Sequence, residues 1–150
     1  MKNVFIIVAI FGILATSCKS TSKISDKNTD IEYVIAKNYY VKNSVETIDN
    51  PKIESKARFN EIFGMATLQG EDGKPTEIDF DKQFVIAIVI PPTNISTTLT
   101  PISLTKNNDD KLELTYSIQK GEEQSHTIKS SLIIIVDKKF NGDVKLIEKE

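Results

Sequence analysis

The sequence of 150 residues has few of the side chains on which enzymatic chemistry most often depends. It contains no tryptophan, one cysteine (Cys18), one histidine (His126) and one arginine (Arg58). A single cysteine excludes an intramolecular disulfide and a zinc site built from several cysteines, and a single histidine excludes a multi-histidine metal centre. With six glycines, the chain contains neither the dinucleotide-binding glycine pattern nor a P-loop. We therefore expect no cofactor and no bound metal.

The charge balance argues against a polyanionic partner. The chain carries 19 basic and 21 acidic side chains, which gives a formal net charge of -2. Proteins that bind nucleic acid normally carry a basic surplus, so no nucleic-acid partner is expected.

The N-terminal stretch is the most informative part of the sequence. Lys2 precedes an uncharged apolar run over residues 4–15 (VFIIVAIFGILA). A helix of these twelve residues would span about 18 Å, whereas the hydrocarbon core of a bilayer is about 30 Å thick. A basic start, a short apolar run and small residues after it are typical of a secretory signal peptide.

The residues after the apolar run indicate the class of signal. The segment LATSC over residues 14–18 places small residues before the only cysteine. It resembles the lipobox of bacterial lipoproteins, in the relaxed form ending in Ser-Cys that is found in the Bacteroidetes group. The leucine stands one place early, and Ser17 replaces the commoner Gly or Ala. The resemblance implies a signal peptide over residues 1–17 and a diacylglyceryl lipid anchor of the palmitate type on Cys18.

Lipidation of Cys18 would attach the mature chain to a membrane, with everything after this residue outside the cytoplasm. Two or more acyl chains hold a protein stably at a bilayer. We expect a location in the bacterial cell envelope, at the outer membrane. The mature chain would have 133 residues (150 minus 17) and a charge of -3, because Lys2 leaves with the signal. The alternatives are an ordinary signal peptide that leaves Cys18 a free thiol, and a retained N-terminal membrane anchor.

The composition divides the remaining chain into a tether and one domain. Residues 18–30 (CKSTSKISDKNTD) are polar, and Ile24 is their only large apolar side chain. Such a segment buries too little apolar surface to offset its ordering entropy, so we predict a flexible tether. Residues 31–150 are expected to form a single β-rich domain.

Hydrophobic periodicity in this domain predicts about six strands. Strands with alternating apolar residues are expected at 31–41, 112–118 and 144–147, and strands buried on both faces at 84–90 and 132–136. Gln124 to Ile128 is expected to open a long strand that continues through residues 132–136. Turns are expected at residues 107–110, at Gly121 and at residues 141–142, the last as a hairpin.

One short helix is predicted between the first two strands. Ser55 is a suitable N-cap, and Phe59, Ile62, Phe63 and Ala66 recur at helical spacing. Gly64 is expected to end the helix in a left-handed conformation. The fold class is therefore α+β, with a mostly antiparallel sheet or sandwich and one short helix packed on it.

The polar side chains give no strong catalytic signal, so no enzyme is expected. His126 is followed and preceded by polar residues, and Ser125, its neighbour, would point to the opposite face of a strand. Four carboxylate pairs occur, and each is expected to serve as solvated turn residues: Asp79 with Asp81, Glu71 with Asp72, Asp109 with Asp110, and Glu122 with Glu123.

Residues 91–101 (PPTNISTTLTP) are the most unusual soluble segment. Prolines flank it, and it is rich in hydroxyl groups. A proline-stiffened loop with apolar tips on a rigid sheet is typical of partner-binding surfaces, so we predict a partner contact here. The predicted contact residues are Thr93, Ile95, Thr97 and Leu99. The alternative is a loop that runs into an edge strand, with Ile95 and Leu99 as rim packing and Pro101 protecting the edge.

The order of motifs over residues 55–140 resembles a known domain. A Phe-x-x-x-Phe-Gly helix end at residues 59–64 is followed by IDFDKQFVIA at residues 78–87 and then by strands. This order is similar to the small β-rich C-terminal domain of bacterial protease-complex subunits and implies a protease-binding or protease-stabilising module. The Thr-Gly-Gly loop of that family is replaced here by residues 92–95 (PTNI), so no binding residue is transferred. A cystatin-like inhibitor fold also fits one helix and an antiparallel sheet.

These observations predict a non-enzymatic, lipid-anchored envelope protein whose domain binds another protein of the envelope, such as a protease. The alternative is a carrier of a small ligand, with a cavity between the sheet and the helix. An apolar pocket larger than about 300 Å³ would favour this alternative.

Overall fold

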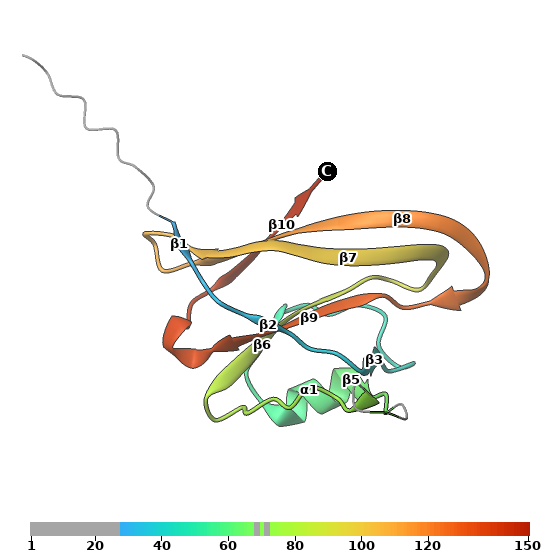
Figure 1. The fold of residues 1–150 in the computed structure, drawn as a ribbon, viewed down its shortest axis with the longest axis horizontal. Coiled ribbons are helices and arrows are strands. Elements are labelled where there is room, and N and C mark those ends of the chain that lie inside the picture. Colours follow the sequence, from blue (N-terminus) through green and yellow to red (C-terminus); the bar gives the residue numbers. More distant parts are fainter. Residues whose placement is uncertain (1–27, 68–69, 71–72) are drawn as a thin grey trace, which may run out of the picture.

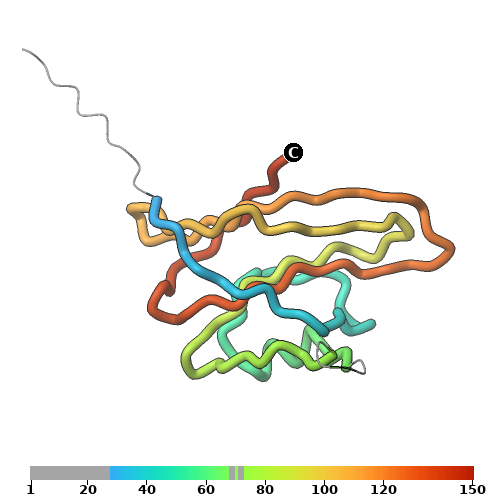
Figure 2. Tube along the Cα trace, in the orientation of Figure 1, coloured from blue at the N-terminus to red at the C-terminus, as the bar shows by residue number. Residues whose placement is uncertain are grey.

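The structure is a computed structural model that describes residues 28–67, 70 and 73–150 (Figures 1 and 2). The predicted signal peptide, Cys18 and all but the last three residues of the predicted tether lie outside the described residues. Among the described residues, no helix is both long and apolar enough to cross a membrane. Most of the described chain is in strands, with a single short α-helix.

The described residues form ten strands rather than about six. The strands are β1 (Thr29–Asp30), β2 (Val34–Ile35), β3 (Tyr39–Val41), β4 (Lys52–Ile53), β5 (Phe63–Met65), β6 (Gln83–Val89), β7 (Thr93–Lys106), β8 (Leu112–Ile128), β9 (Ser131–Asp137) and β10 (Val144–Lys149). The helices are α1 (Lys56–Ile62) and the 3-10 helix η2 (Lys138–Phe140). Five of these strands have only two or three residues, too few for a sequence period to reveal them.

The strands build two four-stranded sheets and one small ribbon. Sheet A has the order β1-β7-β8-β10, sheet B has the order β2-β9-β6-β4, and β3 pairs with β5. Every pairing is antiparallel except that of β10 with β8. Figure 1 shows sheet A on one side of β6 and β9, and α1 with β3 and β5 on the other. The predicted α+β class with mostly antiparallel pairing is confirmed.

Strands β6 to β9 form one long hairpin that is folded in half. β6 pairs with β9 from Gln83 opposite Asp137, and β7 continues the pairing with β8 as far as Lys106 opposite Leu112. The hairpin folds at residues 90–92 on one side and at residues 129–130 on the other. The two prolines of residues 90–92 lack the backbone N–H that would continue the ladder. The two halves lie against each other as the centres of sheets B and A (Figure 2).

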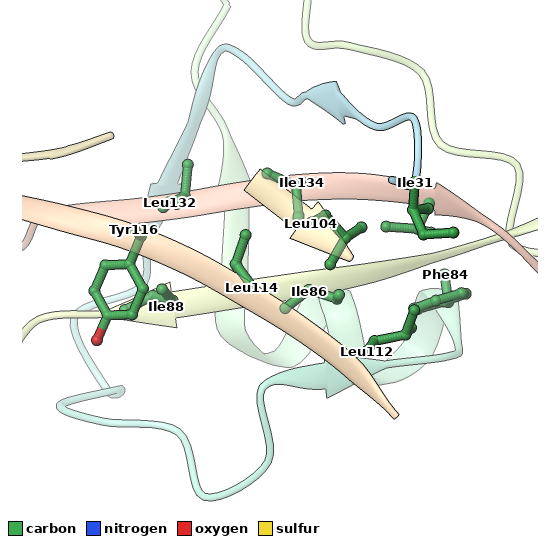
Figure 3. Packing of buried hydrophobic residues seen from close by; sticks show 11 residues of the cluster. Ile31, Phe84, Ile86, Ile88, Leu104, Leu112, Leu114, Tyr116, Leu132 and Ile134 are labelled. Carbon is green, nitrogen blue, oxygen red and sulfur yellow. The ribbon is translucent and has the colours of Figure 1, made fainter. Parts of the chain in front are cut away.

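The central strands of sheet B, β6 and β9, are buried on both faces, as the uninterrupted apolar runs predicted. On β6, the side chains of Phe84, Ile86 and Ile88 pack between the two sheets (Figure 3). The intervening residues, Val85, Ala87 and Val89, pack against the layer that contains α1. β9 divides its side chains in the same way. The alternation predicted for 112–118 is also found, since Leu112, Leu114 and Tyr116 face the sheet-B side.

The predicted helix start is confirmed, whereas its predicted end is wrong. The Ser55 Oγ accepts a hydrogen bond from the Arg58 N–H at 3.2 Å. The helix stops at Ile62, and Gly64 lies in β5 without a positive φ. Gly64 is opposite Tyr40 in the β3–β5 ribbon, and an added Cβ would overlap the Tyr40 ring. The glycine is therefore required for close packing rather than for a helix cap.

Three other local predictions are wrong because chain pairing overrides the local pattern. Residues 31–41 contain two short strands, β2 and β3, rather than one, since the chain crosses from β7 to β9 and Asn38 adopts φ 62°. Gly121 lies within β8, which continues to Ile128 because β7 pairs along it. The break comes instead at residues 129–130, before β9. Residues 141–142 do not make a hairpin, because β10 crosses to sheet A and runs parallel to β8.

Candidate functional site

The segment predicted as a partner-binding loop is mostly strand. Residues from Thr93 onward belong to β7, so the loop prediction is wrong, and the alternative of an edge strand is closer. The described part of β1 pairs only with residues 105–106 of β7, which leaves the outer side of most of β7 without a neighbouring strand. The loop was expected from prolines and hydroxyl residues, but pairing with β8 holds this segment extended.

The hydroxyl groups of this segment bind the backbone. The Thr93 Oγ1 accepts from the Ile95 N–H at 3.1 Å, and the Thr97 Oγ1 donates to the Ile95 carbonyl at 2.9 Å. The Ser130 Oγ donates to the Thr97 carbonyl at 2.6 Å. Ile95 is half-buried, and Leu99 packs against the core between the sheets. Contact of Thr93, Ile95, Thr97 and Leu99 with a partner stays a prediction.

The other singled-out polar residues that the structure describes do not assemble into a reactive centre, and the predicted pair Glu71 and Asp72 lies outside the described residues. His126 is exposed. It lies in a stretch of the β7–β8 pairing where β8 has three more residues than β7 between two successive paired positions. Asp79 builds a turn, since its Oδ1 accepts from the Asp81 N–H at 3.1 Å and its Oδ2 lies 3.3 Å from the Lys82 ammonium. These two contacts, the backbone one first, lower the pKa of Asp79. Over the described residues, no group of three or more His, Cys, Asp or Glu residues is placed to hold a metal ion.

A groove beside α1 is a concave site with a largely apolar lining. It has a volume of about 530 Å³ and lies between α1, the end of β5 and residues 74–80, which run alongside the helix (Figure 1). Its apolar lining consists of Tyr39, Phe59, Met65, Pro75, Ile78 and Phe80. Its charged lining consists of Lys56, Lys74, Glu77 and Asp79. We call this site the α1 groove.

Aromatic contacts fix the floor of the α1 groove. The rings of Tyr39 and Phe59 meet edge to face with centroids 5.1 Å apart, and the Phe80 ring lies 5.7 Å from that of Phe59. Such aromatic pairs add stability beyond their buried area. Phe59 is 3% exposed, so its ring is packed on nearly all sides and forms a fixed part of the floor.

Hydrogen bonds hold the wall formed by residues 74–80 in place. The Tyr39 hydroxyl donates to the Thr76 carbonyl at 2.7 Å, and the Lys37 N–H donates to the Thr76 Oγ1 at 2.9 Å. The Thr76 N–H returns a bond to the Lys37 carbonyl at 3.2 Å. Burial, and then the nearby Glu77 carboxylate, raises the pKa of Tyr39. The phenol therefore stays protonated and keeps its donor at neutral pH.

Met65 stands at the mouth of the groove with 63% of its surface exposed. A methionine side chain is flexible and polarizable, so it adapts to differently shaped apolar ligands. In contrast, the space directly between α1 and sheet B is filled by the second core, which includes Ile62, Val85 and Ile133. The cavity expected between sheet and helix is therefore not found there, and the groove lies beside the helix.

Comparisons with protein-family models, with curated proteins and with solved structures found no match. The chemistry of the α1 groove is therefore the basis for assigning a function. Sequence patterns did not reveal this groove, because its lining comes from four separate segments that meet through the β3–β5 pairing and the hydrogen bonds of Thr76. The one available signal was the density of aromatic residues around the helix, at Tyr39, Phe59 and Phe80.

Proposed function

We propose that the protein is a lipid-anchored protein of the bacterial envelope that binds a small ligand with an apolar group in the α1 groove. The observation that carries this proposal is a groove of about 530 Å³ with a fixed aromatic floor. Small-molecule sites commonly have volumes of about 300–1,000 Å³ and mostly apolar linings with a few polar groups. The groove meets both conditions, whereas the loop that suggested a protein partner is a strand.

The composition of the groove favours binding without catalysis. Among the described residues that line it, there is no histidine, cysteine or serine. Covalent catalysis requires a nucleophile beside a base, and neither the lysines nor the acids here form such a pair. Asp79 is already committed to its turn and to Lys82.

Replacing Met65 by aspartate is expected to weaken ligand binding at least about tenfold, or about 1.4 kcal/mol. A carboxylate at the mouth would bring its hydration shell into an apolar site, which opposes entry of an apolar ligand. The measurement is titration of the full-length protein in nanodiscs with 2-phenylethanol, followed by NMR shifts of the Ile78 and Phe80 amides. Met65→Leu, which keeps an apolar side chain, should retain binding.

The matched control for this prediction is Ile102→Asp. Ile102 is 47% exposed on β7, so the change has the same chemistry on a different surface. It should leave the titration unaltered. Equal loss of binding in Met65→Asp and Ile102→Asp would assign the effect to general damage. Absence of any shift in the groove amides of the unaltered protein, with 2-phenylethanol and with phenylalanine alike, would refute ligand binding at this site.

Replacing Cys18 by alanine is expected to move the protein from the membrane fraction to the soluble fraction. Removal of the acyl chains eliminates the apolar surface that holds the chain at a bilayer, about 0.8 kcal/mol for each buried CH₂. The measurement is fractionation of cells together with metabolic labelling by a palmitate analogue. A variant that remains wholly in the membrane fraction would show that the N-terminal segment itself is the anchor.

A further inference from the structure

We propose that the ligand of the α1 groove is a small zwitterion with an aromatic side chain, of the aromatic α-amino acid class. This inference rests on the proposed function and adds the charge pattern of the ligand to it. The carboxylate of the ligand would lie towards Lys56, its ammonium group towards Glu77, and its ring on the aromatic floor.

The groove is lined by charges of both signs. The α1 wall contributes Lys56 and, one turn later, Asn60, which lie on the same face of the helix at i and i+4. The opposite wall, formed by residues 74–80, contributes Lys74 at its start and Glu77 and Asp79 further along. An occupant that uses both signs presents an anionic group to Lys56 and a cationic group to Glu77.

Among the charged side chains described on the two walls, Asp79 alone forms an ion pair. Among the residues that the structure describes, Lys56, Lys74 and Glu77 take part in no ion pair, whereas Asp79 is paired with Lys82. Lys56 and Glu77 also do not pair with each other, so their charged atoms lie more than 4.0 Å apart. The groove therefore holds a positive and a negative group that do not pair with each other, together with an apolar lining.

An ion of a single sign fits this arrangement less well. An anion would be attracted by Lys56 and Lys74 but repelled by Glu77, and a cation would meet the reverse. A neutral ligand would use neither wall. A zwitterion gains from both walls, and its ring meets Tyr39, Phe59 and Phe80 in edge or offset contacts.

The test compares four probes that share a phenyl ring on a two-carbon chain and differ in the charged groups attached to it. Phenylalanine is the zwitterion, 3-phenylpropanoate lacks its ammonium group, 2-phenylethylamine lacks its carboxylate, and 2-phenylethanol is neutral. Each is titrated at pH 7 into the full-length protein in nanodiscs, with the Ile78 and Phe80 amides as reporters of the groove. Phenylalanine is expected to bind at least about fivefold more tightly than each of the other three, equivalent to about 1 kcal/mol.

Variants that each remove one charge test which wall binds the carboxylate of the ligand and which binds its ammonium group. Lys56→Gln should reduce the affinity for phenylalanine to that for 2-phenylethylamine, and Glu77→Gln should reduce it to that for 3-phenylpropanoate. Both side chains are exposed, so neither change disturbs packing. Lys149→Gln and Glu122→Gln remove the same charges from exposed positions on sheet A and should leave all affinities unchanged. The exchange variant Lys56→Glu with Glu77→Lys should recover the preference for the zwitterion.

The outcomes separate this inference from the proposed function. Equal binding of all four probes, or tightest binding of the anion, the cation or the alcohol, would overturn the zwitterion and leave the groove as an apolar ligand site. No shift of the groove amides with any probe would overturn both proposals. Unchanged preference in Lys56→Gln and Glu77→Gln would likewise overturn the assignment of the charged walls.

Discussion

Replacing Phe84 by alanine is expected to lower the free energy of unfolding by about 3–5 kcal/mol, the usual cost of removing a large buried aromatic side chain. Phe84 is 0% exposed and lies on β6 in the cluster between the two sheets, together with Leu112 and Ile86 (Figure 3). The cavity would adjoin both sheets, and their paired strands limit how far either can move to fill it. The measurement is urea unfolding monitored by far-ultraviolet circular dichroism.

The matched control is Phe140→Ala. Phe140 is only partly buried and packs at the margin of the same cluster. The same truncation there should cost about 1–2 kcal/mol, because the vacated space opens to solvent. If Phe84→Ala were no more harmful than Phe140→Ala, the contact between the sheets would not be the main source of stability.

The two strands that meet at this core were predictable from sequence for a local reason. Both faces of β6 and β9 are buried, so nearly every residue in these strands is apolar, as in the runs 84–90 and 132–136. At its start, β8 packs only one of its two faces against the core. This half-burial produces the alternation of Leu112 and Leu114 with polar residues. Each pattern depends only on the burial of its own segment.

β7 was not predictable, because a distant segment determines its conformation. Its prolines and hydroxyl residues are typical of a loop, yet it pairs with β8 over most of its length. The hydroxyl groups of Thr93 and Thr97 bond to the backbone of Ile95, and this use cannot be distinguished from solvent exposure in the sequence. Pairing of these strands gives residues 83–137 their shape as one folded hairpin.

The α1 groove was unpredictable for a related reason. Tyr39 and Met65 face each other only because β3 and β5 pair, and each of these strands has three residues. Residues 74–80 complete the groove without regular secondary structure of their own apart from a turn. A lining assembled from such short pieces produces no hydrophobic periodicity in the sequence. The N-cap of the neighbouring helix at Ser55 was predictable, because it depends on local residues alone.

Replacing Lys129 by methionine is expected to lower the free energy of unfolding by about 3 kcal/mol, through the loss of several charge-assisted hydrogen bonds. The Lys129 ammonium donates to three backbone carbonyls, those of Lys42 at 3.2 Å, Asn43 at 2.8 Å and Val45 at 2.7 Å. It lies where the long hairpin folds, between β8 and β9, and ties the turn after β3 to this end of the sandwich. Methionine keeps the aliphatic stem and removes only the donor.

The comparison that isolates this effect is Lys138→Met. The Lys138 ammonium donates to one carbonyl, that of Phe80 at 2.5 Å, so its removal should cost about 1 kcal/mol. Urea unfolding gives both values, and hydrogen exchange should show faster opening of residues 43–48 in Lys129→Met alone. Equal destabilisation by the two substitutions, or unchanged exchange in residues 43–48, would mean that water replaces the ammonium at these carbonyls. The turn after β3 would then be held by the packing of Val45 and Ile48 against the second core.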